Sequence, residues 1–523
     1  MATLTANRLT RRRFTAAAAT LALTCLHAAR PSGALAQIGT PEISKSVDWE
    51  AFDASLEAAM TTFDMAGAAV SVVTVDDIAY RRMFGVRNTQ TGETIDPDTH
   101  FLVASTTKSM TALLVATYVD EGVLSWDQPV HEIFPDFRAP TSELTQNLRV
   151  RDMLDMASGI GEPDAISAFH QGDPTTDQLL NLLGTLPVIA SPGAEFFYNG
   201  TVYSAGGYLP ALALGVDPAD LGPEFANQMT ERVYRPCGMT TARITDDPRP
   251  FSDNYATGYA PDLTLGTSEQ PFAPVGSYAP AGGTMATHTE MTSYLMMQLN
   301  GGVAPDGTRV VSEENLAECW SSNVDVPFDA TATPDLERAG YGLGWLSFTY
   351  RGGRRYISHA GGIDGFTTYL AFLPGDGVGL VVNTNTGPLS RGVPFVQYVS
   401  ALLLEAWFGL DSGAAETVLS QYKASAQAFA ELAELVSPVD EVAIAPWLGY
   451  YERGWRITAG GGAVHLRQSS RAIPLLALPD GSYVMGSGVA PGSAVKLSKD
   501  ESGLPRLEIV GLETVRWTTG ESE

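Results

Sequence analysis

A serine and a lysine stand three residues apart at the start of an apolar run, in the segment Ser105-Thr-Thr-Lys108. On an α-helix, positions i and i+3 share a face, so the Lys108 amine can reach the Ser105 oxygen and accept its proton. The run that follows, residues 110–119, is apolar on nearly every side of such a helix, which is typical of a helix inside a protein. We therefore predict a buried helix around which the chain folds, with Ser105 as a candidate nucleophile and Lys108 as its partner.

Lysine usage distinguishes this serine and lysine from similar pairs elsewhere. The same spacing recurs at 420–423, in a polar alanine-rich stretch, and at 493–496, in an expected strand where i and i+3 face opposite ways. The chain holds five lysines, and Lys108 is the only one between residues 46 and 422. Arginine cannot be deprotonated, so the one lysine in an apolar helix indicates a need for an amine. The alternative interpretation is a lysine that extends from a surface helix into water.

The N-terminus resembles a twin-arginine export signal. Residues 1–36 contain Thr10-Arg11-Arg12-Arg13-Phe14, then an apolar run, then Ala34-Leu35-Ala36. We expect cleavage after Ala36 and a protein that works in the periplasm or outside the cell. The apolar run is too short for a bilayer span, and no later stretch reaches about 18 apolar residues, so no stable membrane span is expected after cleavage.

The charge of the chain argues against nucleic acid as a partner. Acidic residues number 59 against 32 basic ones, for a formal net charge of -27, and such a surface repels phosphates. Cys237 and Cys319 remain after the signal segment, and whether they pair is left open. They form no cluster with histidines of the kind that binds zinc, so we expect no metal site and no cofactor. The sequence does not indicate an oligomeric state.

The order of expected strands and helices indicates an α+β fold. Two strand-like runs near the start, 68–75 and 78–84, are joined by a short hairpin turn. Later in the chain, with a turn expected at Gly361-Gly362, come three more strands: 354–358, 366–373 and 379–383. Helical stretches lie between the two groups, so the first and last strands form one antiparallel sheet with a helical subdomain. We assign residues 45–410 to this domain.

The character of the sequence changes after the sheet domain. Residues 411–440 are alanine-rich and polar, as in a linking helix, and contain a boundary at Ser437-Pro438. Beyond them, in residues 441–523, short runs that alternate apolar and polar side chains are separated by glycine-rich turns. Such a pattern is typical of a small β-meander or barrel. We predict a separate C-terminal all-β domain there.

Two further motifs follow Ser105 and Lys108 in a fixed order, Tyr198-Asn199-Gly200 and then His359-Ala360-Gly361. This order resembles that of the S-x-x-K, Y-x-N and H-x-G motifs of the serine β-lactamase and penicillin-binding-protein superfamily. The branch it resembles includes class C β-lactamases, D-aminopeptidases, carboxypeptidases and β-lactamase-type esterases. The segments that also match are Met153–Gly159, Pro280–Gly283 and Gly340–Trp345. The resemblance covers residues 45–410 and implies a β-lactamase/transpeptidase-like fold, while the C-terminal part resembles the lipocalin-like domains of some relatives.

The resemblance implies a chemistry for these residues. Ser105 would attack a carbonyl carbon to form an acyl-enzyme, which water then hydrolyses. The backbone N–H groups of Ser105 and Gly362 would form the oxyanion hole, with Gly361 beside them in the substrate-binding wall. Free lysine and tyrosine side chains both titrate about three units above neutral pH, so we assign the base role jointly to Lys108 and Tyr198. Tyr198 would also protonate the leaving group.

Two features depart from the pattern of the superfamily. The superfamily has asparagine two residues after the tyrosine, where this chain has Gly200, and Asn199 stands one place early. Either Asn199 bends in to bind the substrate, or that contact is lost. His359 takes the place of a third-motif lysine, so a fixed cation for a substrate carboxylate is missing, and Arg354 and Arg471 are candidates to supply one. Loss of the asparagine contact would weaken recognition of β-lactams or peptides and favour simpler esters, and the missing cation points the same way.

Each motif residue also has a structural alternative. Tyr198 can be a packed aromatic residue with a bonded hydroxyl, and His359 a hydrogen-bonded histidine at a strand end. Taken together, the motifs predict an exported serine hydrolase that cleaves a small ester, amide or peptide through an acyl-Ser105 intermediate, with esters or D-amino-acid peptides favoured over β-lactams. A class C-type β-lactamase or a D-alanyl-D-alanine carboxypeptidase is the alternative among enzymes. A non-catalytic penicillin-recognition protein that acts as a sensor is the alternative from another class.

Overall fold

The computed structural model describes most of the chain between residues 47 and 518. The stretches left out within it are 162–173, 273, 329–334, 388–390, 453–454, 469–470, 489 and 510–512. The predicted signal segment, residues 1–36, lies outside the described residues. None of the described helices is long and apolar enough to cross a lipid bilayer.

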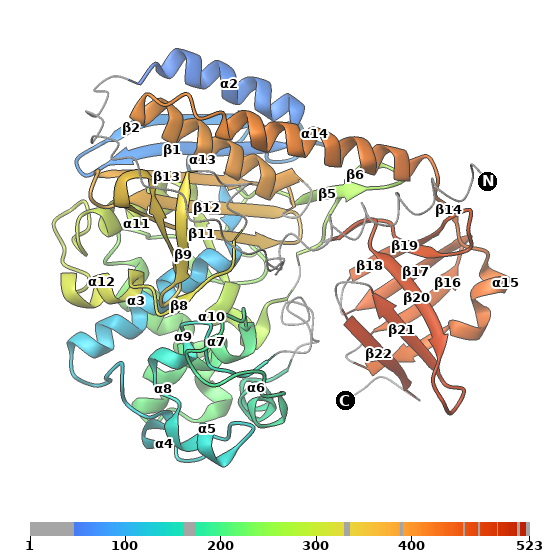
Figure 1. Ribbon diagram of the computed structural model, residues 1–523, viewed down its shortest axis with the longest axis horizontal. Coiled ribbons are helices and arrows are strands. Elements are labelled where there is room, and N and C mark those ends of the chain that lie inside the picture. The colour runs from blue at the N-terminus through green and yellow to red at the C-terminus, as the bar shows by residue number, and fades with distance from the viewer. Residues whose placement is uncertain are drawn as a thin grey trace, which may run out of the picture.

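An eight-stranded antiparallel sheet forms the centre of the first domain (Figure 1). Its strands, in spatial order, are β2 (Ile78–Gly85), β1 (Gly67–Thr74), β13 (Val378–Thr384), β12 (Phe366–Leu373), β11 (Arg354–Ile363), β10 (Leu346–Tyr350), β9 (Leu336–Tyr341) and β8 (Val324–Asp325). β1 pairs with β13, with Val72 opposite Leu380, so strands from the two ends of the domain lie side by side. The predicted antiparallel sheet is confirmed.

Helices cover both faces of this sheet (Figure 1). α2 (Trp49–Thr62), α13 (Val393–Phe408) and α14 (Ala414–Ala433) lie on one face, and α3 (Thr107–Asp120) and α11 (His288–Leu299) lie on the other. Neighbouring residues of a strand point to opposite faces, so Val72 packs with the α2 side and Val73 with the α3 side. α14, the helix expected to link the domains, buries Tyr422 in the α2 side of the core.

The helical subdomain lies between β2 and β8 in the chain. Its remaining helices are α4 (Val130–Ile133), α5 (Ser142–Asn147), α6 (Thr176–Leu182), α7 (Gly200–Gly207), α8 (Leu209–Ala213), α9 (Leu221–Met229), α10 (Ala279–Gly282) and α12 (Glu313–Trp320). Its short strands are β3 (His100–Leu102), β4 (Arg243–Ile244), β5 (Tyr259–Asp262), β6 (Gly266–Glu269) and β7 (Thr284–Thr287). α3 is buried on every side from Thr107 to Tyr118, as its apolar sequence predicts.

The C-terminal sheet is an almost closed barrel (Figure 1). α15 (Glu441–Ile444) accompanies its strands, which are β14 (Ser437–Pro438), β15 (Gly449–Tyr451), β16 (Arg456–Gly460), β17 (Ala463–Gln468), β18 (Arg471–Ala477), β19 (Tyr483–Met485), β20 (Ala494–Lys499), β21 (Pro505–Ile509) and β22 (Glu513–Thr518). β18 pairs with both β17 and β19, which brings the two ends of the sheet together. Ile457, Leu466 and Leu507 are buried inside it. The predicted all-β C-terminal fold is confirmed, and β14 lies within the segment expected to be a linker.

One predicted turn is wrong. Gly361 and Gly362 lie inside β11, which continues to Ile363. The turn into β12 is Asp364-Gly365, where Gly365 has a φ of 75° that favours glycine. Gly361 allows a close approach of β11 to the turn before Ser105, so this glycine pair did not mark a turn.

Candidate active site

Ser105 lies in a tight turn at the start of α3. The 3₁₀ turn Ala104–Thr106 follows β3 directly, and Ser105 is 5% exposed. Ala104 has a φ of 49°, a left-handed conformation that is uncommon for a residue with a side chain. The Thr106 hydroxyl donates to the Val103 carbonyl at 2.8 Å and holds the turn closed. Strained backbone of this kind is concentrated at functional sites, where the surrounding fold stabilises it.

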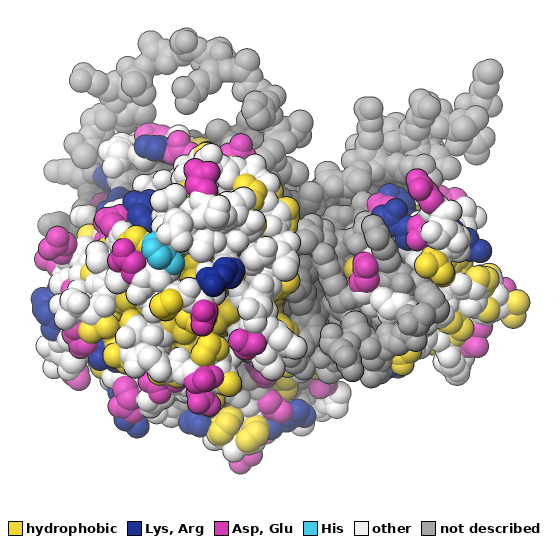
Figure 2. Space-filling model, turned by 90° about the horizontal axis from the view of Figure 1, so that it is seen from below, with side chains coloured by type: hydrophobic (Ala, Val, Ile, Leu, Met, Phe, Trp, Pro, Cys, Tyr) yellow, Lys and Arg dark blue, Asp and Glu magenta, His cyan; other side chains and the backbone are white. Residues whose placement is uncertain are grey.

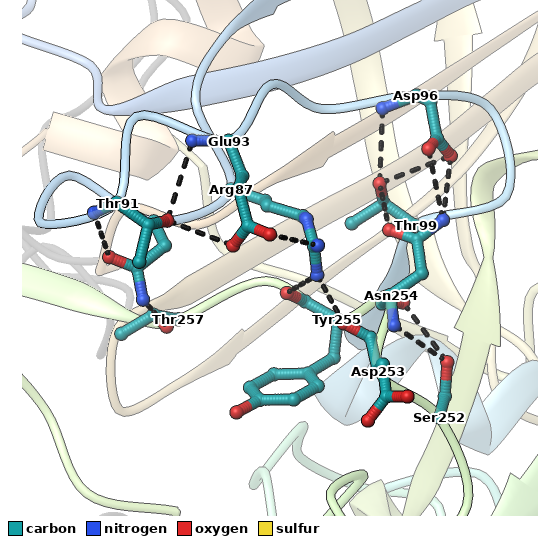
Figure 3. Close-up of polar contacts among 11 residues, drawn as sticks. Arg87, Thr91, Glu93, Asp96, Thr99, Ser252, Asp253, Asn254, Tyr255 and Thr257 are labelled. Atoms are coloured by element: carbon teal, nitrogen blue, oxygen red, sulfur yellow. Dashed lines mark hydrogen bonds and ion pairs between the residues drawn. The ribbon is translucent and has the colours of Figure 1, made fainter.

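Polar contacts fix the chain that leads into this turn (Figure 3). The Asn254 amide donates to the Asp96 carboxylate at 2.9 and 3.0 Å and accepts from the Thr99 hydroxyl at 2.9 Å. The Asn254 carbonyl accepts the His100 N–H at 2.9 Å, and Arg87 donates to the carbonyls on either side of Asn254. β3 is therefore anchored before the chain reaches Ser105.

Lys108 is completely buried one turn further along. Its Nζ is 3.2 Å from the Oγ of Ser105 and donates to the carbonyl of Ala281 at 2.7 Å. The ring centroids of Tyr198 and Tyr203 lie 4.8 and 5.5 Å from the same nitrogen, and aromatic faces attract an ammonium. The structure therefore brings together the serine, the lysine and the tyrosine of the first two motifs.

Tyr203 supports the lysine from α7. It is fully buried, and its hydroxyl donates to the backbone carbonyl of Lys108 at 2.7 Å, which fixes the helical turn that carries the amine. Burial raises the pKa of Tyr203 well above its usual value, so the phenol remains a neutral donor. Sequence reasoning missed Tyr203, because it stood within an expected apolar helix and outside every motif.

Asn199 does not replace the asparagine of the superfamily. It is 1% exposed and caps α7: its Oδ1 accepts the N–H of Val202 at 2.9 Å, and its Nδ2 donates to the carbonyl of Ile160 at 3.0 Å. An N-cap asparagine satisfies backbone donors that the helix itself leaves open. The structure therefore gives Asn199 a helix-capping role, and its contact with substrate stays a prediction. Gly200 has no side chain that could take over this contact.

His359 lies close to Lys108 but is neutral. Its Nδ1 donates to the Ala360 carbonyl at 2.6 Å, so Nε2 carries no proton and accepts the Tyr341 hydroxyl at 3.1 Å. Burial, and then the charge of Lys108, lower the pKa of His359 to about 3. Both ring nitrogens of His359 are hydrogen-bonded, and Tyr341 holds the side chain in place. The role in the site that the third motif implies for His359 stays a prediction. Tyr341 belongs to a segment whose resemblance was noted without any role for this residue.

Gly361 lets β11 pass directly over the nucleophile turn. A Cβ at Gly361 would lie 2.1 Å from the carbonyl oxygen of Val103 and 3.1 Å from the N of Ser105, so any side chain there forces the two segments apart. This contact is the physical reason for glycine at the end of the third motif.

Gly362 occupies the free edge of β11. Pairing with β10 ends at Ser358, whereas pairing with β12 continues to Ile363 opposite Phe366. The N–H groups of an antiparallel strand alternate between its two edges, and the residues that close a two-residue hairpin bond each other. The N–H of Gly362 therefore points away from β12, toward the edge that β10 does not cover. The oxyanion role predicted for Gly362 requires an N–H that β12 does not occupy.

A second serine and histidine contact lies in the interior and is not a site. The Oγ of Ser71 is 2.7 Å from Nε2 of His288, and Nδ1 of His288 is 2.8 Å from Oδ1 of Asn383. None of the three side chains is exposed, and burial lowers the pKa of His288 to about 4. A substrate cannot reach this group, which ties β1 and β13 to α11.

The described residues offer no metal site, since no group of three or more histidine, cysteine or acidic side chains among them could hold an ion. Cys237 and Cys319, whose pairing the sequence left open, are both buried free thiols. On the face seen in Figure 2, acidic side chains are scattered and basic ones form no continuous patch.

Asp155 carries a buried carboxyl group in the segment Met153–Gly159. It is 3% exposed, and its Oδ1 accepts the N–H of Ala157 at 2.9 Å. Burial raises the pKa of Asp155 from 3.8 to about 7, so the folded protein retains a proton there that the unfolded chain releases. Stability contributed by the neutral form is therefore lost as the pH rises from about 3.8 to about 7.

Replacing this carboxyl by an amide tests that shift. Asp155→Asn keeps the Oδ1 acceptor and cannot ionise. We expect its free energy of unfolding, relative to the wild type, to rise by about 4 kcal/mol between pH 4 and pH 8. Urea unfolding at both pH values measures it. Asp152→Asn, which removes the partner of Arg149, is the control and should destabilise at pH 8. If the difference in unfolding free energy between Asp155→Asn and the wild type is the same at both pH values, the pKa of Asp155 is not raised.

A family model described as Beta-lactamase matches residues 52–403. Penicillin-binding protein 4 of Amycolatopsis lactamdurans is 27% identical over 336 residues, which cover 63% of this chain and 84% of that protein. The D-alanyl-D-alanine-carboxypeptidase/endopeptidase AmpH of Escherichia coli K12 is 25% identical over 390 residues, or 72% of this chain and 92% of AmpH. The octameric penicillin-binding protein homologue from Pyrococcus abyssi superposes with a TM-score of 0.59 at 20% identity, over 90% of this chain and 100% of that one.

Proposed function

Because this chain belongs to the Beta-lactamase family and is a serine hydrolase of that family, we propose that it cleaves an ester or amide through an acyl intermediate on Ser105. The observation that carries the proposal is the buried amine of Lys108, 3.2 Å from the Ser105 oxygen, at the start of a helix that β11 covers. A buried amine next to a serine hydroxyl has the geometry of a nucleophile and its base.

The reaction would proceed in two halves. The Oγ of Ser105 attacks the carbonyl carbon and its proton passes to the pair formed by Lys108 and Tyr198, while the N–H groups of Ser105 and Gly362 stabilise the negative oxygen. Each such donor lowers the barrier by about 3 kcal/mol. The bond to the leaving group then breaks as that group takes a proton from Tyr198. Water then attacks the acyl carbon and gives one proton to the same pair. The bond between the acyl carbon and the Oγ of Ser105 breaks, Oγ takes that proton back, and the carboxylic acid product leaves.

Three residues near Ser105 and Lys108, His359, Asn199 and Gly200, support the proposal of a neutral acyl substrate. His359 is neutral and bonded at both nitrogens, Asn199 is engaged by backbone, and Gly200 has no side chain. A substrate carboxylate would thus meet no fixed cation from these residues, which disfavours penicillin-type substrates. AmpH, a relative named for carboxypeptidase and endopeptidase activity, supports peptide amides with D-residues as the second choice after esters.

Turnover by the mature protein, from residue 37 onward, tests the proposal. We would measure hydrolysis of 4-nitrophenyl butyrate, D-alanyl-4-nitroanilide and nitrocefin by wild type and by Ser105→Ala, with intact mass during each reaction. We expect ester turnover that the mutation abolishes and an acyl adduct on the wild type only. Nitrocefin as the preferred substrate would support a β-lactamase instead. Slow adduct formation without turnover would indicate a penicillin-recognising binder.

Export is a second part of the proposal. The arginines, the apolar run and the small residues of 1–36 support delivery to the periplasm by a twin-arginine route. Export is measured by cell fractionation of the full chain and of the double variant Arg11→Lys/Arg12→Lys. The wild type should appear outside the cytoplasm with a new N-terminus near Gln37, and equal retention of both proteins inside would contradict it.

A further inference from the structure

A buried ion pair joins the C-terminal barrel to the hairpin of the site. Asp364 follows the end of β11, two residues after Gly362, and its carboxylate accepts a hydrogen bond from Nε of Arg471 at the start of β18. Asp364 is 5% exposed and Arg471 is 8% exposed. The hairpin that carries Gly361 and Gly362 is therefore held at its tip by a residue of the other domain.

The tip of the hairpin is also clamped by β5. A Cβ at Gly365 would lie 2.5 Å from the Cα of Gly258, and the N–H of Tyr259 donates to the Gly365 carbonyl at 3.3 Å. The β5–β6 hairpin reaches from the first domain toward the barrel (Figure 1), where the N–H of Leu263 donates to the Gly486 carbonyl at 2.8 Å. Four buried side chains seal this contact: Leu263, Leu432, Leu476 and Val484. The barrel thus contacts both the tip of the hairpin and the strand on which the tip rests.

The ion pair is the main compensation for burying the guanidinium. Among the described residues, Nη2 of Arg471 is buried and has no hydrogen-bond partner, so the charge depends on Asp364. A buried charge that loses its partner is strongly unfavourable, and the structure responds by shifting or by admitting water. Because Gly361 rests against the Val103 carbonyl and the Ser105 N, a shift of the hairpin changes the distance between the Gly362 N–H and Ser105. A misplacement of about 1 Å in a catalytic group costs roughly 100-fold in rate.

We propose that Arg471 is a positioning residue for the acylation site: through Asp364 it fixes the hairpin that holds Gly361 and Gly362 over Ser105. The C-terminal barrel is then a working part of the hydrolase. This inference rests on the proposed function of Ser105. The sequence analysis named Arg354 and Arg471 as candidate cations for a substrate carboxylate. Arg354 lies at the opposite end of β11 and pairs with Asp376 at 3.2 Å.

The test uses the mature full chain with 4-nitrophenyl butyrate as substrate. We expect Arg471→Gln and Asp364→Asn each to lower kcat at least tenfold while KM changes less than threefold, because the oxyanion donor acts on the transition state more than on the bound ester. The kcat of the double variant should be no lower than that of the slower single variant, because both substitutions remove the same ion pair. Arg471→Lys, which keeps the charge, should recover part of kcat.

Arg354→Gln is the matched control, because it breaks another largely buried ion pair, at the opposite end of the same strand and away from Ser105. It should lower the thermal midpoint and leave kcat unchanged. The proposal would be overturned if Arg471→Gln and Asp364→Asn lose stability but keep kcat within twofold of the wild type. The rates must be measured at a temperature where both variants remain folded. If Arg471→Gln does not fold, the kcat values of Asp364→Asn and Arg471→Lys test the proposal instead. Absence of Ser105-dependent turnover in the wild type would instead reject the proposed function.

Discussion

Lys108→Met should lower kcat/KM for a 4-nitrophenyl ester by about 1,000-fold, because the general base of a serine hydrolase contributes between about 100- and 10,000-fold. Methionine has a similar length and fills the buried space without an amine. The proton of Ser105 would then have no acceptor at the position that Nζ occupies, 3.2 Å from the oxygen. The rate of labelling by a fluorophosphonate, followed by intact mass, reports the same step without turnover.

Lys423→Met is the control for this change. Lys423 lies three residues after Ser420 with the same spacing, but it is exposed on α14. Its replacement should leave kcat/KM and labelling unchanged. Lys108→Arg adds a second comparison, because arginine keeps the charge and cannot accept a proton, so it should be as inactive as the methionine variant. A Lys108→Met protein that retains more than a tenth of the wild-type rate would show that another group is the base.

Gly361→Ala should reduce acylation by roughly 100-fold or more, because the new Cβ would stand 2.1 Å from the Val103 carbonyl oxygen and must push β11 away from the nucleophile turn. Overpacking at a rigid contact also costs about 1–3 kcal/mol of stability. We would measure kcat/KM, fluorophosphonate labelling and the thermal midpoint of the same preparation.

Gly375→Ala is the matched control on the same sheet. Gly375 lies in the turn between β12 and β13, and a Cβ there has nothing within 4 Å. It should change neither activity nor stability measurably. A Gly361→Ala protein with wild-type acylation would mean that the hairpin can move without disturbing the site, and would also weaken the positioning role of Arg471.

Much of the fold could be predicted because its signals are local. Alternating and apolar runs marked β1, β2, β12 and β13, and their side chains do point to two different cores. The helix after Ser105 is apolar all round, and α3 is indeed buried on every side. Helical spacing alone placed Lys108 within reach of Ser105, since three residues advance almost one helical turn.

The sequence was least informative about residues whose surroundings come from distant parts of the chain. Gly361-Gly362 looked like a turn, because the sequence does not show that Val103 lies under the strand. Asn199 was a candidate substrate ligand, and the sequence did not show that its amide bonds the start of α7 and the carbonyl of Ile160. His359 was a candidate site residue, and the sequence did not show that Tyr341 and the Ala360 carbonyl bond its two ring nitrogens.

The sequence by itself determined the serine and lysine pair, the order of the motifs and the class of fold, because helix and strand periodicity are properties of neighbouring residues. Only the tertiary structure decided the neutral state of His359, the need for glycine at Gly361, and the ion pair between Asp364 and Arg471, which stand 107 residues apart. Burial, charge and close contact at a point in space depend on every segment that packs there, and no local pattern records them.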